Sequence, residues 1–443
     1  MNAAMHARVN SGKKAGGSTG LLPWIFPAML SVGAVHVLLS DRNLADSFVA
    51  LQSVAEPARP ALAAWWQRAV SVLLLVAAVE QVANHIALRR RVPSLPLLAA
   101  FLAYWAGTVA VPAVFGAHPA FSHELLYAPA VGVACCLARP EEQARIARMA
   151  RDGLMLLMLL GVAGLAVRPA MVADMTYAGG LLPGVPRLAG LTAHPVTQGM
   201  LAQVALLLLW AAPYRHRALH AAAWALGLGV LAMAQSKTAW AAFGLCALAV
   251  LAWRHGALAW RHMGDPLRPQ AGLAAWGLAA TGVFVLAAGL LAGDLTRGAS
   301  DFMDSPQGAQ LASLTGRDRI WAAAAEEWRS HPVFGYGVTL WDAAYRATIG
   351  LPHATHAHNQ LMDDAARAGT VGVLALAGYA AVLAALALRH ARSTAALSVA
   401  LLLAIALRGI SEVPLLLLGY GTELFTHLLL LATLAGAAAE ARG

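Results

Sequence analysis

The chain has 443 residues, of which 59% are hydrophobic and only 12% are charged, and its mean hydropathy is +0.63. Soluble proteins carry about 25% charged residues, so this composition excludes an ordinary soluble enzyme and indicates an integral membrane protein. The net charge of +9 does not require a nucleic-acid partner, because membrane proteins collect Lys and Arg in their cytoplasmic loops.

Apolar segments near 20 residues long recur along the chain, so we expect an all-α integral membrane protein with about 12 transmembrane helices. The first segment has no convincing signal-peptide cleavage site before Asp41, and we expect it to be retained as a span. The expected spans are residues 21–39, 61–87, 94–114, 122–138, 153–168, 195–213, 218–235, 238–253, 271–293, 369–388, 394–408 and 414–436.

Basic residues in the short loops orient these spans. Arg89, Arg90 and Arg91 form the clearest cluster, and the bias of such clusters predicts that both termini are cytoplasmic. The chain then divides into three parts: transmembrane helices 1–9 (1–293), one large periplasmic loop with the catalytic motifs (294–368), and transmembrane helices 10–12 (369–443).

The large loop mixes charged, aromatic and apolar residues and can therefore form structure of its own. Residues 319–331 have helical spacing, with Ile320, Ala324 and Trp328 on one face. Residues 358–369 predict a second helix that runs into the tenth span. The glycines of FGYG (334–337) predict a tight turn between these two helices.

Four polar segments fall on the outward side in this topology. Arg187, Lys237, Arg317 and Arg319 supply cations there, and several converging cations would suit a pyrophosphate. Alternatively, the arginines extend to lipid headgroups or pair with nearby acidic residues. The segments are RLAGLTAHP (187–195), QSKTAW (235–240), TGRDRIW (315–321) and HATHAHNQ (353–360).

His358 stands at the expected start of a helix. The positive end of the helix dipole disfavours the imidazolium form, and a neutral imidazole can act as a general base. The neighbouring Asn359 would orient a substrate hydroxyl or cap the helix. His353, His356 and His358 could instead bind zinc or have a structural role, but their spacing matches no zinc-enzyme motif, and we expect no metal.

The order of these motifs resembles the O-antigen ligase superfamily, which includes O-antigen ligases, O-antigen polymerases and bacterial O-linked protein oligosaccharyltransferases. The twelve expected spans and the late large loop extend the resemblance over nearly the whole chain. The residues that carry it are Ser236-Lys237, Gly316-Arg317 with Trp321, His331-Pro332 followed by Gly335-Tyr336-Gly337, His356-Ala357-His358-Asn359, and Gly369 with Gly372.

The resemblance implies a bacterial inner-membrane glycosyltransferase of lipopolysaccharide biosynthesis whose active site faces the periplasm. Its donor would be a glycan on undecaprenyl pyrophosphate, its acceptor a hydroxyl of the lipid A–core oligosaccharide, and it would need no cofactor. His358 matches the essential histidine and Arg317 the loop arginine. Lys237 stands where many members have Arg and lacks the bidentate fork, and Arg187 matches a less sharply defined basic position. Supporting positions are His356, Asn359, Gly316, Trp321 and Ser236.

The expected reaction is a single displacement. Cations would stabilise the departing pyrophosphate, and His358 would take the proton of the attacking hydroxyl. A retaining route needs a nucleophilic carboxylate, and none stands out on the outward side, so inversion is expected. The alternatives are a polymerase or protein-glycosylating relative, a transporter, and a metal-dependent oligosaccharyltransferase, although Asp41 and Asp46 are too far apart for the acidic pair of that last class.

The topology can be tested with reporter fusions. Fusions after Arg91, Arg217 and Arg392 should score cytoplasmic, and a fusion near Ser305 should score periplasmic, because the basic short loops orient the spans. A periplasmic signal after Arg217 would contradict the topology, since it would place the polar segments on different sides of the membrane.

Overall fold

The computed structural model describes residues 20–46, 59–177, 182, 184–262 and 317–442, with the backbone alone for 255–262. The expected ninth span (271–293) and Gly316 lie outside these residues. The described elements are η1 Leu22–Trp24, α2 Ile25–Leu39, α4 Ala61–Ala87, α5 Leu95–Trp105, η2 Ala106–Ala110, α6 Val111–Phe115, η3 His123–Leu126, α7 Tyr127–Cys136, α8 Pro140–Val167, α9 Pro169–Val172, β1 Ala173–Asp174, β2 Arg187–Leu188, α10 Pro195–Ala211, α11 Arg217–Met233, α12 Lys237–His262, α16 Arg317–Ser330, α17 Ala343–Ile349, α18 Gln360–Arg389, α19 Leu397–Gly409 and α20 Thr422–Glu440.

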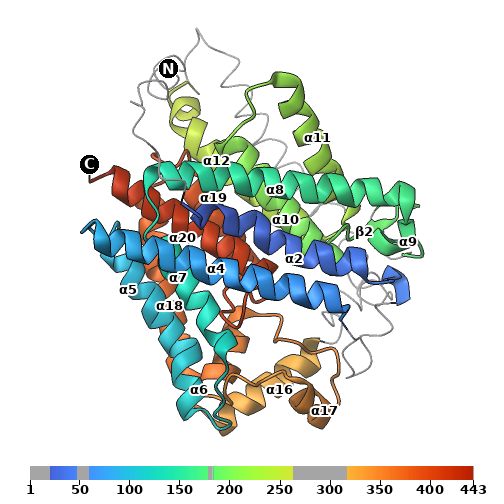
Figure 1. Ribbon diagram of the computed structural model, residues 1–443, viewed down its shortest axis with the longest axis vertical. Helices are drawn as coiled ribbons and strands as arrows, with labels where there is room; N and C mark the ends of the chain where they lie inside the picture. Colours follow the sequence, from blue (N-terminus) through green and yellow to red (C-terminus); the bar gives the residue numbers. More distant parts are fainter. Residues whose placement is uncertain (1–19, 47–58, 178–181, 183, 263–316, 443) are drawn as a thin grey trace, which may run out of the picture.

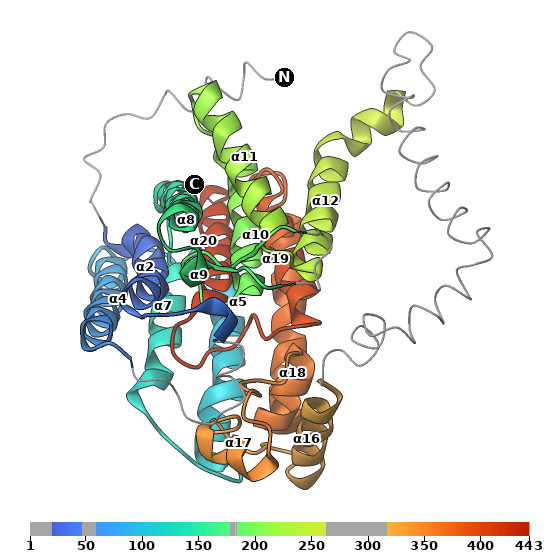
Figure 2. The same ribbon diagram turned by 90° about the vertical axis from the view of Figure 1, so that its right-hand side faces the viewer.

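Helices α2, α5, α7, α8 and α19 pack around α20 (Figure 1). Every residue of α20 from Leu424 to Ala438 is buried. This segment is rich in Leu and Ala and carries no Asp, Glu, Lys or Arg, and a helix that is apolar on all sides is stable only when other helices surround it. Figure 2 shows α16 and α17 at one end of the molecule, which we call the loop end, and the free end of α11 at the other.

Six described helical segments are long and apolar enough to cross a membrane: Leu22–Leu39, Ala61–Ala87, Leu95–Phe115, Pro140–Val167, Gln360–Arg389 and Thr422–Glu440. They confirm an all-α membrane protein and match six of the expected spans, whereas the total of twelve stays a prediction. The expected sixth, seventh and eleventh spans are apolar helices of 10–17 residues. The expected fourth span contains the four-residue η3 and the ten-residue α7, which together are too short to cross a hydrocarbon core of about 30 Å.

The loop end has a small apolar core of its own. Ile320 and Ala324 of α16 pack there with Trp341 and Tyr345. The two helices expected in the large loop are therefore present as α16 and the start of α18. Trp328 departs from the expected face, since it is 39% exposed.

A sharp bend divides α18 at Gly369, which has φ 63° and ψ −158°. Only glycine adopts this region without strain. At the bend, the expected turn around Gly335 packs against the helix backbone: the N–H of Tyr336 donates to the carbonyl of Ala366, and the N–H of Thr370 donates to that of Pro332. A Cβ atom on Gly369 would lie 2.4 Å from the carbonyl carbon of Val333.

The bend folds the two arms of α18 toward each other. The hydroxyl of Tyr104 donates to Asp364 in the first arm, and its ring stacks on Tyr379 in the second arm with 4.8 Å between centroids. In a straight helix the Cα atoms of these two residues would be about 22 Å apart, too far for one tyrosine to contact both. The bend therefore returns the start of α18 to the end of α19, where an added Cβ on Gly409 would lie 3.5 Å from the Cβ of Gln360.

Arg42 connects the end of the first span to the segment that leads into α10. Its guanidinium donates to the carbonyls of Met171, Gly190 and Thr192 at 2.6–3.0 Å. These carbonyls flank the short β1–β2 pair, in which Asp174 faces Arg187. Arg42 thereby holds in place the segment that carries Arg187.

The bend at Gly369 predicts a specific weakness. Gly369→Ala should destabilise the protein by at least ~1–3 kcal/mol, because alanine is strained at this φ/ψ and its Cβ would meet the Val333 backbone. Thermal unfolding of the detergent-solubilised protein should show a lower Tm. Gly378→Ala is the matched control in the same helix, where an added Cβ meets nothing within 4 Å. Equal Tm values for the two variants would contradict this account of the bend.

Candidate active site

His358 lies two residues before α18, near the helix start as the sequence predicts, and it faces a carboxylate that the sequence analysis missed. Its Nδ1 is 3.2 Å from Oε2 of Glu412, in the segment between α19 and α20. The backbone of His358 has φ +50°, a conformation uncommon outside glycine that neighbouring contacts must hold in place. One such contact is the N–H of His358, which donates to Nδ1 of His356 at 3.1 Å.

His356 is the second histidine of the cluster. Because its Nδ1 accepts the His358 N–H, its neutral ring carries the proton on Nε2, and this atom lies 3.5 Å from Oε2 of Glu412. Burial, together with the nearby charge of His358, lowers the pKa of His356 to about 4. A neutral His356 therefore directs an N–H at the carboxylate at neutral pH.

Arg317 completes the cluster from the first position of α16. Its Nη2 lies 3.7 Å from Oε1 of Glu412, the oxygen not facing the histidines. Burial alone would raise the pKa of Glu412, but its hydrogen bond with His358 and the charges of His358, His356 and Arg317 hold that pKa below its usual value. The four side chains are 18–24% exposed, so they remain within reach of a ligand.

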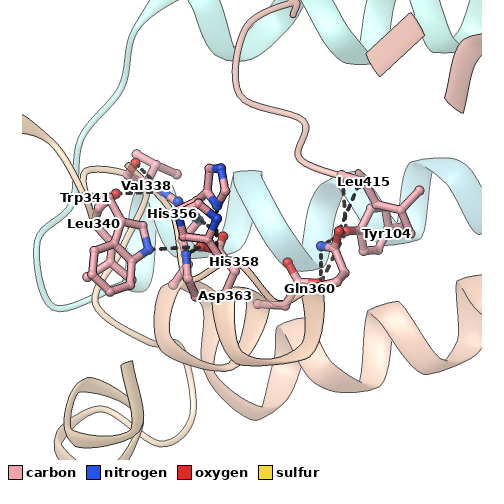
Figure 3. Close-up of polar contacts among 12 residues, drawn as sticks. Tyr104, Val338, Leu340, Trp341, His356, His358, Gln360, Asp363 and Leu415 are labelled. Carbon is pink, nitrogen blue, oxygen red and sulfur yellow. Dashed lines mark hydrogen bonds and ion pairs between the residues drawn. The ribbon is translucent and has the colours of Figure 1, made fainter. Parts of the chain in front are cut away.

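Two tryptophans and a second carboxylate fix the segment that carries the histidines, residues 356–358, which we call the histidine turn. The indole N–H of Trp321, a predicted supporting residue on α16, donates to the carbonyl of Ala357 at 2.8 Å. The fully buried Asp363 accepts from the N–H of Ala357 and the indole of Trp341, both at 2.9 Å. The same carboxylate pairs with Arg367 at 3.1 Å, and Figure 3 shows the bond from the Trp341 indole to Asp363 beside the two histidines.

A second group contains the predicted residues of segments 187–195 and 235–240, which are Arg187, Ser236 and Lys237. Arg187 lies over the ring of Tyr177 and donates a long hydrogen bond of 3.5 Å to the carbonyl of Ala234. This places Arg187 beside the turn before α12, where Ser236 Oγ accepts from the N–H of Ala239 as a helix cap. Lys237, the first residue of α12, is exposed.

His194 connects the two groups electrostatically. Burial and, to a smaller extent, the charges of Arg187 and His358 lower the pKa of His194 to about 4, while the charge of Glu412 opposes this shift. Since these interactions weaken with distance, His194 lies within range of both groups. Its Nδ1 also accepts from the N–H of Val196 and so caps α10.

The remaining predicted positions differ in their placement. Asn359 caps α18, because its Oδ1 accepts from the N–H of Met362 at 3.0 Å. Arg319 is exposed, and a step of two residues turns a helix by about 200°, so its side chain leaves α16 on a different face from Arg317. The structure does not bring Arg319 to the cluster.

The ligand atoms of His356, His358 and Glu412 lie within 4.8 Å of one another, close enough to hold a metal ion. The hydrogen bonding of His356 opposes that use. Ligation through Nε2 would move the ring proton to Nδ1, where it would face the backbone N–H of His358. The cluster therefore fits a proton-transfer site better than a metal site.

One signal could have revealed Glu412. It is an acidic residue in the short segment between the eleventh and twelfth expected spans, which the topology places on the same side as His358 and Arg317. An ionisable group so close to a membrane span needs a partner, and His358 and Arg317 are partners that the sequence places on the same side.

The apolar helices and the polar cluster near the loop end define a multi-pass membrane protein with a histidine–carboxylate–arginine site. Residues 221–377 match the family model described as O-antigen ligase, so the resemblance to the O-antigen ligase superfamily is confirmed. The match covers Lys237, Arg317 and His358, whereas Arg187 and Glu412 lie outside it. Among curated proteins, none matches the chain.

Proposed function

We propose that this protein is an O-antigen ligase of the bacterial inner membrane. It transfers a glycan from undecaprenyl pyrophosphate to a hydroxyl of the lipid A–core oligosaccharide at the periplasmic face. The observation that supports this proposal most strongly is the contact of His358 and Arg317 with one carboxylate, Glu412, because it combines a base and a cation in one partly exposed site.

His358 acts as the general base. A proton on Nδ1 would be donated to Glu412 at 3.2 Å, which leaves Nε2 with the lone pair that accepts the proton of the acceptor hydroxyl. The acceptor oxygen forms a bond to the anomeric carbon while the bond from that carbon to the pyrophosphate oxygen breaks. Glu412 stabilises the imidazolium that results and fixes its orientation, as carboxylates do for other catalytic histidines.

Arg317 stabilises the departing pyrophosphate. Its contact with Glu412 is long, at 3.7 Å, and a guanidinium has five N–H donors, so donors remain for phosphate oxygens. Lys237 and Arg187 would meet the more distant part of the pyrophosphate or the first sugar. Cations placed where negative charge accumulates act most strongly in the transition state.

The reaction should invert the anomeric configuration. Glu412 is a carboxylate near the base, but both of its oxygens already face other groups, Oε2 the histidines and Oε1 Arg317. A carboxylate held in this way is a poor nucleophile, and the retaining route needs one free to attack.

The acceptor decides between the ligase and its relatives. Purified protein in nanodiscs should be given a lipid-linked glycan donor together with lipid A–core, a second lipid-linked glycan, or a pilin-like protein. The proposal requires glycan-modified lipid A–core as the main product. A longer lipid-linked glycan would instead identify a polymerase, and a glycosylated protein would identify a protein oligosaccharyltransferase.

Substitutions of Arg317 and of His358 should have different effects on donor binding and turnover. Arg317→Ala should weaken donor binding as well as turnover, and Arg317→Lys should recover only part of the loss because lysine lacks the bidentate fork. His358→Ala should bind the donor normally but turn over ~10²–10⁴-fold more slowly, as expected for loss of a general base. Donor binding and transfer rate should be measured for each variant in nanodiscs.

The matched controls for these variants are Arg329→Ala and His353→Ala. Both residues are exposed, Arg329 on the same helix as Arg317 and His353 five residues before His358. Both controls should retain wild-type binding and turnover. Near-normal transfer by His358→Ala would exclude His358 as the base.

Transfer should survive removal of divalent metals. The tautomer of His356 opposes metal ligation, and cationic side chains are present to neutralise the pyrophosphate. Wild-type transfer should be measured after treatment with a strong chelator and again after adding back Mg²⁺, Mn²⁺ or Zn²⁺. Loss of activity that a divalent ion restores would overturn the metal-independent mechanism.

A further inference from the structure

Three consecutive residues face one segment of the chain. His358 contacts the side chain of Glu412, and its two successors contact the backbone on either side of that glutamate. Asn359 Nδ2 donates to the carbonyl of Ile410 at 3.2 Å, and Gln360 Oε1 accepts from the N–H of Leu415 at 2.9 Å. The segment 410–415 is therefore held on both sides of Glu412.

Segment 410–415 needs such support. It lies between α19 and α20 and has no regular secondary structure. The N–H of Glu412 still bonds to the carbonyl of Arg408, but the segment then leaves the helical path. Buried backbone groups that leave a helix require other partners, and Gln360 supplies the partner for Leu415.

The amide of Gln360 is fixed in one orientation. Its Nε2 donates to the hydroxyl of Tyr104 at 3.2 Å and to Oδ2 of Asp364 at 3.1 Å. Reversing the amide would place its NH₂ group against the N–H of Leu415, a donor against a donor. The Tyr104 hydroxyl also lies 3.2 Å from the carbonyl oxygen of Leu415, so both backbone groups of Leu415 are held, as Figure 3 shows.

We propose that Asn359 and Gln360 are positioning residues that hold Glu412 in register with His358. The inference rests on the proposed function, because it assigns Glu412 as the partner of the base. These two side chains act on the backbone of segment 410–415 and not on the substrate. They set the separation between carboxylate and imidazole, and a displacement of about 1 Å can cost as much as 10²-fold in rate.

Two variants separate positioning from helix capping. Asn359→Asp keeps the oxygen that caps α18 but replaces the donor to Ile410 with a second oxygen. Gln360→Met keeps the length of the side chain but removes both its acceptor and its donor. Gln81→Met is the matched control, since Gln81 is another buried glutamine, whose bonds go to Leu137 and Glu142 where α7 meets α8.

The expected result is a decrease in kcat of about 10- to 100-fold for Asn359→Asp and Gln360→Met, with donor binding unchanged. The acidic limb of the pH profile of kcat/KM should move, because the base and its carboxylate partner no longer meet at the wild-type distance. Glu412→Gln should shift the limb in the same direction. Gln81→Met should leave the limb in place even if it lowers the Tm.

A double-mutant cycle provides the decisive measurement. If Gln360 acts through Glu412, Gln360→Met should slow the Glu412→Gln variant by less than about 3-fold. Multiplicative losses in the double variant, or a lower rate with an unmoved acidic limb, would overturn the proposal.

Failure of the proposed function would look different. In that case the wild-type protein transfers glycan to no acceptor, and the His358 ring can be titrated by NMR of ring-labelled histidine, assigned with His358→Gln. A shift of its midpoint in the same direction in Glu412→Gln and in Gln360→Met would support the positioning role. An unchanged midpoint in Gln360→Met would exclude it.

Discussion

The site depends on one half-buried carboxylate. Removing a charge from water near a bilayer is costly unless hydrogen bonds and opposite charges compensate it. Glu412 obtains this compensation from the histidine turn on one oxygen and from Arg317 on the other. The end of α19, the start of α18 and the start of α16 are therefore constrained by the same group, although they lie far apart in the sequence.

Two carboxylates near the loop end have different tasks. Asp363 is completely buried, and its carboxylate accepts hydrogen bonds from Arg367, Trp341 and the backbone of Ala357. It therefore stabilises the conformation of the histidine turn. Glu412 is partly exposed and faces groups that can exchange protons. The bend at Gly369 serves both, because it brings the first arm of α18 back beside the end of α19.

Much of this arrangement could be predicted from the sequence. Hydropathy located the long apolar helices, and helical spacing located α16 and the start of α18, with His358 two residues before it. Glu412 was not predicted, because loop charge shows on which side of a membrane a residue lies but not which side chain it meets. The bend was not predicted either, because the helical pattern continues through Gly369. Only the backbone hydrogen bonds between residues 366–371 and the 332–337 turn reveal that the helix changes direction.

The place of Glu412 in the chain also affects biogenesis. Synthesis of the chain reaches Arg317 and both histidines before residue 412, and the carboxylate can take its position only after the segment between α19 and α20 has been made. Until then the nascent protein holds an imidazole and a guanidinium without their counterion. Assembly of the candidate site is thus coupled to synthesis of the region between α19 and α20, so chains that end before residue 412 would lack its carboxylate.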